Sequence, residues 1–352
     1  MTELKTKNIQ YIDTLRALAI IGVIIVHVAT PAINMNFHKN MGFWSIGLVY
    51  DSAVRFAVPL FLILSGVTML GKEYNLTEFY KKRFTRVLIP FLFWLPAYWV
   101  FRWFMLRPFE QPKEFSDIIN WAGQLYLKDG VSVHLWYIYM ILFLYIFLPF
   151  ISKIVVQTNK KTILIFLFIW LIINILQSFK IISTDNFPFI LKKMYAYSLY
   201  AGYLVLGYYL KTISIKSNHT KLISVIAFGV TILIASIPTY FLNVNSTKQN
   251  LFLLGTFTIN TVIQTVAIYF IFKDSNFSNK YISLIINTIS NYSFGVYLVH
   301  VMVISVFFRY GIFWTMAHPL ISIPLVTLLT LMTSLIIIYI MIKIPVLKVF
   351  AG

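Results

Sequence analysis

The chain alternates between long apolar runs and short polar gaps along its whole length. A membrane-spanning helix needs about 20 consecutive apolar residues, and ten runs close to this length can be distinguished. The runs are continuously apolar and lack the alternation of membrane barrel strands, so the pattern predicts helices. The predicted spans cover residues 12–33, 44–70, 87–106, 134–152, 162–179, 194–210, 222–242, 251–272, 286–308 and 320–342.

The predicted spans leave no room for a second domain. Ten spans use roughly 200 residues, and the longest gap between them runs from 107 to 133. We therefore expect residues 1–352 to form one membrane domain with no separate soluble domain. The first ten residues are polar and contain no small-residue cleavage site, so we expect the first run to be retained as an anchor.

The composition supports the same fold class. Hydrophobic residues make up 59% of the chain and charged residues 11%, whereas soluble domains contain roughly 25% charged residues. We therefore expect an all-α, polytopic protein of the cell membrane. The chain contains no cysteine, which excludes thiol catalysis, disulfides and zinc–thiolate sites.

The net charge of +18 is distributed unevenly, and this predicts the orientation. Eighteen Lys and Arg residues fall on the side of the N-terminus and nine on the opposite side, while Arg55 and Arg102 lie within spans, which accounts for all 29. Because basic residues concentrate on the cytoplasmic side, both termini are predicted to be cytoplasmic. The basic residues thus follow membrane sidedness, and we expect no nucleic-acid partner.

Ionisable side chains inside a span are costly, so each one is a candidate for function. The first span carries Arg16 and His27, which are eleven residues apart. At 100° per residue they share one helix face, about 16 Å apart along the axis. The alternative is that Arg16 extends to the interface while His27 bonds to a neighbouring helix.

Residues 11–27, YIDTLRALAIIGVIIVH, resemble the opening of the membrane enzymes of acyltransferase family 3. The hallmark of that family is an Arg or Lys, ten residues and then a His, which Arg16 and His27 match. The chain as a whole departs modestly from the family pattern. Leu62-Ile63-Leu64 replaces part of the second-helix signature, and Lys82 stands where many members have Arg. Five further segments resemble family motifs in the same order: PLFLILSG (59–66), KRFTR (82–86), HLWY (134–137), YLVLGYYL (203–210) and SNYSFGVYLVH (290–300).

The resemblance implies a membrane enzyme that moves an acyl group, usually acetyl, from cytoplasmic acyl-CoA. The implied acceptor is a hydroxyl of an envelope glycan or of its lipid-linked precursor. The matched His27 would be the catalytic residue, as general base or as acyl acceptor. Acyl-CoA is then a donor substrate, and no permanently bound cofactor is expected. There is no appended esterase-like domain, so this chain would complete the transfer alone or with a partner.

The remaining candidates have weaker support. A guanidinium binds phosphate well, so Arg16, Arg83 and Arg86 could hold coenzyme A, although Arg83 and Arg86 could equally be ordinary cytoplasmic charge. The substrate candidates are His134, Trp136, Tyr137, Tyr297 and His300. The alternative for the first three is an aromatic belt at the membrane interface, and the alternative for His300 is a structural hydrogen bond. The structural candidates are Asp13, the Asp51–Arg55 pair at i,i+4 and Ser65 beside a glycine. No His has a second ligand at i+3 or i+4, so no metal site is predicted.

Two other functions are compatible with the same features. A transporter or flippase for a lipid-linked sugar would also bury charges in ten spans, and Pro59, Pro90 and Pro96 are expected to interrupt early spans, without a matching set in the second half. A scaffold in an envelope complex is the third alternative. The sequence does not determine the acceptor or whether the acyl group is acetyl, succinyl or longer. It also leaves open whether a covalent acyl-enzyme forms and whether the protein is a homo-oligomer.

Overall fold

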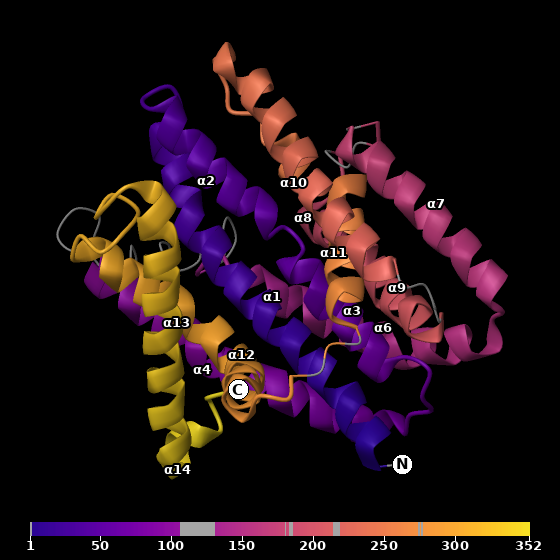
Figure 1. The fold of residues 1–352 in the computed structure, drawn as a ribbon. Helices are drawn as coiled ribbons and strands as arrows, with labels where there is room; N and C mark the ends of the chain where they lie inside the picture. The colour runs from indigo at the N-terminus through magenta and orange to yellow at the C-terminus, as the bar shows by residue number, and fades with distance from the viewer. Residues whose placement is uncertain are drawn as a thin grey trace.

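A computed structural model describes residues 2–105, 131–179, 181–182, 186–213, 219–273, 275 and 277–352. These residues form helices and no strand, which confirms the all-α prediction. Residues 106–130, which include most of the longest gap between predicted spans (107–133), lie outside the described residues. The helices (Figure 1) are α1 (Thr2–Asn36), α2 (Met41–Ala53), α3 (Ala57–Met69), α4 (Leu76–Met105), α6 (Trp136–Gln157), α7 (Lys160–Ser178), α8 (Phe189–Leu199), α9 (Ala201–Thr212), α10 (Thr220–Val244), η1 (Phe252–Leu254), α11 (Ile259–Phe272), α12 (Lys280–Arg309), α13 (Pro319–Lys343) and α14 (Pro345–Lys348).

Nine stretches of the described chain are long and apolar enough to cross a membrane. The remaining predicted span, the sixth (194–210), is interrupted at Tyr200, where α8 ends and α9 begins. The indole of Trp170 donates to the Leu199 carbonyl at this break over 2.7 Å, and the neighbouring Gly202 leaves room for the Trp170 ring. The chain is thus an all-α polytopic membrane protein, and one of its predicted spans is a pair of short helices.

The second predicted span, 44–70, is also two helices, α2 and α3, with a break between Ala53 and Ala57. Backbone groups freed inside a membrane need partners within the protein. Gln264 of α11 supplies them: its side-chain amide donates to the Ser52 carbonyl (2.8 Å) and its oxygen accepts from the Phe56 amide (3.0 Å). One side chain therefore bridges the broken helix.

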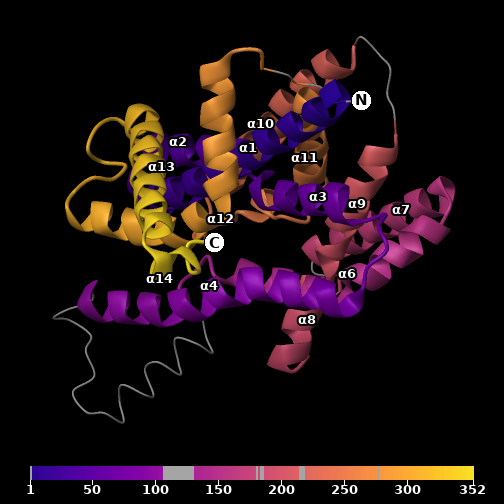
Figure 2. The same cartoon turned by 90° about the horizontal axis from the view of Figure 1, so that it is seen from below.

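Of the expected proline interruptions, the one at Pro59 coincides with the break before α3, whereas those at Pro90 and Pro96 were wrong. Pro59 lies within the first turn of α3, where proline is tolerated. Pro90 and Pro96 both lie inside α4, which is continuous. This helix begins at Leu76, earlier than the predicted start at 87, so the basic segment 82–86 is helical. Figure 2 shows α4 along one face of the protein with α14 beside it, and the Trp94 indole donates to the Phe350 carbonyl there (3.0 Å).

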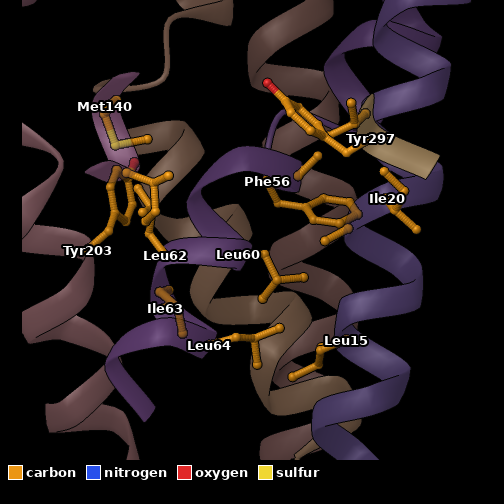
Figure 3. Packing of buried hydrophobic residues seen from close by; sticks show 14 of the residues in the cluster. Leu15, Ile20, Phe56, Leu60, Leu62, Ile63, Leu64, Met140, Tyr203 and Tyr297 are labelled. Atoms are coloured by element: carbon orange, nitrogen blue, oxygen red, sulfur yellow. The ribbon is translucent and has the colours of Figure 1, made fainter. Parts of the chain in front are cut away.

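Helices α3 and α9 touch backbone to backbone. A Cβ atom added to Gly66 would overlap the Leu204 carbonyl of α9, and one added to Gly207 would overlap the Ile63 carbonyl of α3. In Figure 3, Ile63 lies on the side of α3 that faces Tyr203, whereas Leu60 lies on the side toward α1. Helix α3 is therefore held between α9 and α1. The glycine beside Ser65 was expected to allow close helix approach, and Gly66 allows it toward α9.

Replacing Gly66 with alanine is expected to destabilise this crossing. The new methyl group would meet rigid backbone, and overpacking of this kind costs about 1–3 kcal/mol. The thermal unfolding midpoint of the purified protein in detergent should fall. The matched control is Gly229→Ala on α10, where a Cβ meets nothing within 4 Å; equal midpoints for the two variants would contradict the proposed close contact.

Helices α1 and α12 run in the same direction. Arg16 near the start of α1 donates to Ser290 near the start of α12 (3.1 Å), and eleven residues later His27 lies against His300, with ring centroids 5.2 Å apart. The predicted topology also sends these two spans, the first and the ninth, across the membrane in the same sense. The parallel packing aligns the functional candidates of both helices at two levels.

Candidate functional site

Three imidazole rings meet at the centre of the protein. His27 comes from α1, His300 from α12, and His134 from the segment that precedes α6. The ring centroids of His134 and His300 are 5.1 Å apart, those of His27 and His300 5.2 Å, and those of His27 and His134 6.4 Å. Within the described residues, no group of three His, Cys, Asp or Glu side chains is arranged to hold a metal ion.

Hydrogen bonds fix the orientation of two of these rings. His300 Nδ1 lies 2.7 Å from the Tyr297 carbonyl oxygen, which can only accept, so Nδ1 carries the proton. His134 Nδ1 lies 2.9 Å from the Ser132 hydroxyl. The Nε2 atoms of both rings are buried and have no hydrogen-bond partner within the described structure. Both rings are therefore held through Nδ1, and their Nε2 atoms are enclosed by the protein.

His27 lines a small chamber, which we call the histidine chamber. Its volume is about 30 Å³. Unlike His134 and His300, which are 2% and 0% exposed, His27 is only partly buried. The chamber walls are formed by Val23, His27, Val58, Phe61, His134, Trp136, Tyr137 and Tyr297.

A larger cavity of about 280 Å³, the arginine cavity, lies toward the starts of α1, α4 and α12. Three guanidinium groups, those of Arg16, Arg83 and Arg86, line it, and its walls contain no carboxylate. Within the described chain, Arg83 and Arg86 take part in no ion pair. The other wall residues are Phe61, Leu64, Ser65, Thr68, Met69, Val87, Tyr137, Ile141, Tyr145, Ser290, Asn291, Ser293, Phe294 and Tyr297.

A short polar network holds Arg16 in place. Its guanidinium is 3.1 Å from the carboxylate of Asp13 and donates to the Ser290 hydroxyl at 3.1 Å, and that hydroxyl donates to the same carboxylate at 2.6 Å. Asp13, a structural candidate in the sequence, holds Arg16 together with Ser290 of α12. Arg16 therefore keeps a fixed direction while part of its side chain, 33% exposed, faces the cavity.

The two cavities share three side chains, Phe61, Tyr137 and Tyr297. The ring centroids of Phe61 and Tyr137 are 6.3 Å apart, and those of Tyr137 and Tyr297 are 5.4 Å apart. The Tyr297 hydroxyl donates to the His134 carbonyl, which ties this wall to the histidine cluster. A molecule bound at the three arginines thus has three aromatic rings between it and His27.

A family model described as an acyltransferase domain matches residues 9–342. The chain belongs to acyltransferase family 3. Neither the search of curated proteins nor the search of solved structures gave a match. The match covers nearly the whole described bundle, so this protein is a membrane protein of the acyltransferase type.

Most predicted site residues of this acyltransferase come together. Arg16, Arg83 and Arg86 share one cavity, and Ser65 lines it too, with its hydroxyl donating to the Phe61 carbonyl at 2.9 Å rather than serving only close packing. The interfacial alternative for the segment 134–137 does not fit the structure. His134 is buried against His27, while Trp136 and Tyr137 line the histidine chamber.

The Asp51–Arg55 pair forms, but not along one continuous helix face as expected. Asp51 is fully buried in α2, whereas Arg55 lies in the break before α3, and the two side chains are ion-paired there. The positive charge of Arg55 is within electrostatic range of the His27 ring. The broken helix thus places a paired cation beside the histidine cluster.

Sequence reasoning missed two residues of this site. Phe61 belongs to both cavities but is one apolar residue within the predicted span 44–70. Tyr98 donates to the Leu298 carbonyl at 2.8 Å and packs on His134 with centroids 5.0 Å apart. Phe61 lies in the segment PLFLILSG that resembles a family motif, which is the signal that could have identified it. Tyr98 lies outside every recognised motif.

Proposed function

We propose that this protein transfers an acyl group from cytoplasmic acyl-CoA to a hydroxyl of an envelope glycan or lipid-linked sugar. The observation that carries the proposal is the alignment of two cavities across one aromatic wall. The arginine cavity offers three cations at the predicted cytoplasmic side, and the histidine chamber places His27 beyond the wall. The family supplies the reaction class, and the arrangement favours a donor with phosphates at one end and a reactive acyl group at the other.

The arginine cavity suits the phosphates of coenzyme A. Arg83 and Arg86 are three residues apart on α4, so both can face one ligand. A guanidinium binds phosphate through two parallel hydrogen bonds. With about 16 Å between Arg16 and His27 along α1, the extended pantetheine arm would carry the thioester from this cavity to the wall. The thioester would then lie next to His27.

In the proposed step, His27 removes the proton from the acceptor hydroxyl as the oxygen attacks the thioester carbonyl. An imidazole is well suited to this at neutral pH. The carbon–sulfur bond breaks, and coenzyme A leaves as the thiol with the proton. If His27 instead accepts the acyl group first, a bond from its ring nitrogen to the acyl carbon forms as the carbon–sulfur bond breaks. The acceptor oxygen then attacks the acyl carbon, and the carbon–nitrogen bond breaks to release His27. His134, which also lines the chamber, would hold the acceptor hydroxyl beside His27, and His300 would pack behind both rings.

The transporter alternative depends on broken helices. Among the described residues two predicted spans are broken, α2/α3 and α8/α9, and they pack on each other through Gly66 and Gly207. They are the second and sixth predicted spans, so they do not occupy corresponding positions in two halves, as inverted repeats would require. The family and the aligned cavities therefore favour chemistry over transport.

The test is release of coenzyme A. Purified protein is mixed with acetyl-CoA and envelope glycan extracted from the source organism, and free thiol is followed with a thiol reagent. Because the chain contains no cysteine, the protein adds no background. We expect thiol release that depends on the glycan and on protein concentration. Thiol at the rate of a protein-free control would contradict the proposal, and glycan movement across a vesicle membrane without acyl-CoA would favour the transporter.

A further inference from the structure

Another cavity, separate from the arginine cavity and the histidine chamber, lies on the predicted cytoplasmic side. Its volume is about 510 Å³, and none of its wall residues lines either of the other two. It forms where the loop 70–75, between α3 and α4, meets the last turns of α6. Ser152 of α6 fixes this meeting, because its hydroxyl donates to the Lys72 carbonyl (2.6 Å) and accepts from the Lys72 amide (3.0 Å). We call it the lysine cavity.

Two lysine side chains give the lysine cavity its charge. Lys72 comes from the loop and Lys153 from α6, and both are exposed. Within the described chain neither ammonium takes part in an ion pair. Glu73 lines the same cavity, so the wall carries two cations and one anion. This balance favours a ligand with a single negative charge, and an ammonium group is a common partner of phosphate.

The lysine cavity adjoins the surface of α6 that faces lipid. Phe150, Ile154 and Val156 of this membrane-spanning helix are 53%, 61% and 54% exposed, and Phe150 and Val156 also line the cavity. Lys153 lies about 4.5 Å beyond Phe150 along the helix axis. The cavity therefore joins an apolar surface to a basic one at the predicted cytoplasmic end of the span. Basic pockets in this position bind the headgroups of anionic lipids.

We propose that the lysine cavity binds an anionic phospholipid of the phosphatidylglycerol class, with Lys72 and Lys153 on its phosphate. The acyl chains would lie along Phe150 and the neighbouring apolar side chains of α6. Glu73 would accept a hydrogen bond from a hydroxyl of the glycerol headgroup. Phosphatidylcholine has neither a net charge nor a headgroup hydroxyl, and phosphatidylethanolamine has a donor but no net charge. The site is distinct from the acyltransfer site, and the proposal does not rest on acyl transfer.

The test variant is the double substitution Lys72→Gln, Lys153→Gln, which removes both charges and keeps long polar side chains. The matched control is Lys81→Gln, Lys161→Gln. Lys81 of α4 and Lys161 of α7 are exposed, belong to the same predicted side and line none of the three cavities. The two double variants have equal net charge, so a difference between them reports the cavity and not the general attraction of a basic protein for anionic lipid.

The experiment adds phosphatidylglycerol, phosphatidylethanolamine or phosphatidylcholine with identical acyl chains to the purified protein in detergent. Native mass spectrometry counts the bound lipids, and the thermal unfolding midpoint is measured in parallel. We expect the natural protein and the control to retain one phosphatidylglycerol preferentially and to unfold at a higher temperature with it. The Lys72→Gln, Lys153→Gln variant should bind it with a Kd at least about tenfold higher, with an unchanged midpoint in the absence of lipid.

Four outcomes would overturn the proposal. The first is equal affinity of the two double variants for phosphatidylglycerol, and the second is equal binding of all three lipids by the natural protein. The third is an equal rise of the midpoint with inorganic phosphate, which would show that a free anion is enough. The fourth is a higher KM for acetyl-CoA with unchanged lipid binding in the Lys72→Gln, Lys153→Gln variant, which would assign the lysines to the donor. The lipid measurements need no turnover, so failure of acyl transfer would leave them standing.

Discussion

Replacing His27 with alanine should lower the rate of coenzyme A release from acetyl-CoA by roughly 100- to 10,000-fold, the usual contribution of a general base. His27 lines the chamber, and of the three histidines at this site it alone is only partly buried. The KM for acetyl-CoA should change little, because the proposed phosphate contacts lie in the arginine cavity. The measurement is the steady-state rate of thiol release by purified protein.

The control for this experiment is His38→Asn. His38 is exposed, lies 2.5 Å from the Ser246 carbonyl and has a φ of 60°, a conformation that asparagine tolerates. Both variants should keep the thermal unfolding midpoint of the natural protein to within a few degrees. Undiminished turnover by folded His27→Ala protein would exclude His27 as base and as acyl acceptor.

The double variant Arg83→Gln, Arg86→Gln should raise the KM for acetyl-CoA by roughly 10- to 100-fold or more. A hydrogen bond to a charged group contributes about 1.5–3 kcal/mol, and each 1.4 kcal/mol is tenfold in binding. The value of kcat at saturating donor should change far less, since neither side chain touches the chamber. The KM of the double variant should also lose most of its dependence on salt.

Lys82→Gln is the control, because Lys82 belongs to the same basic segment, is exposed and lies outside the cavity wall. A double variant in which both KM and kcat are unchanged, or a Lys82→Gln variant with an equal increase in KM, would show that these charges serve membrane orientation alone. A double variant with unchanged KM and a large loss of kcat would place the arginines in the reaction step instead.

The features that depend on one helix were predictable from the sequence. The eleven-residue spacing of Arg16 and His27 placed them on one face, and α1 is continuous over both residues. The number of apolar runs and the distribution of Lys and Arg also predicted that α1 and α12 cross the membrane in the same direction. The Arg16–Ser290 and His27–His300 contacts agree with this parallel arrangement. Such features follow from local geometry and from the cost of polar groups in lipid.

The features that depend on distant partners were not predictable. The break between α2 and α3 is stable because Gln264, more than 200 positions away, bonds to both of its ends. The hydropathy of residues 44–70 is the same with or without that partner, so the pattern predicts one helix. His134 is a similar case, since its burial follows from the meeting of α1 and α12 beside the segment that leads into α6.

The chamber wall was predictable in part. Phe61, Tyr137 and Tyr297 come from three helices, and all three lie in segments that resemble family motifs. Tyr137 and Tyr297 were substrate candidates on that ground, whereas Phe61 was not singled out. Their place between two cavities is a property of the packed bundle, which the sequence alone does not give.

In the proposed reaction, the acyl group enters from coenzyme A at the arginine side and is transferred at His27. The most direct measurement uses sealed proteoliposomes that contain protein of one checked orientation. Radiolabelled acetyl-CoA, which does not cross the bilayer, is supplied on one side only. Label should reach the glycan when acetyl-CoA is on the side of Arg83 and Arg86, and His27→Ala should remove this transfer. Equal transfer from the opposite side, or from His27→Ala protein, would contradict it.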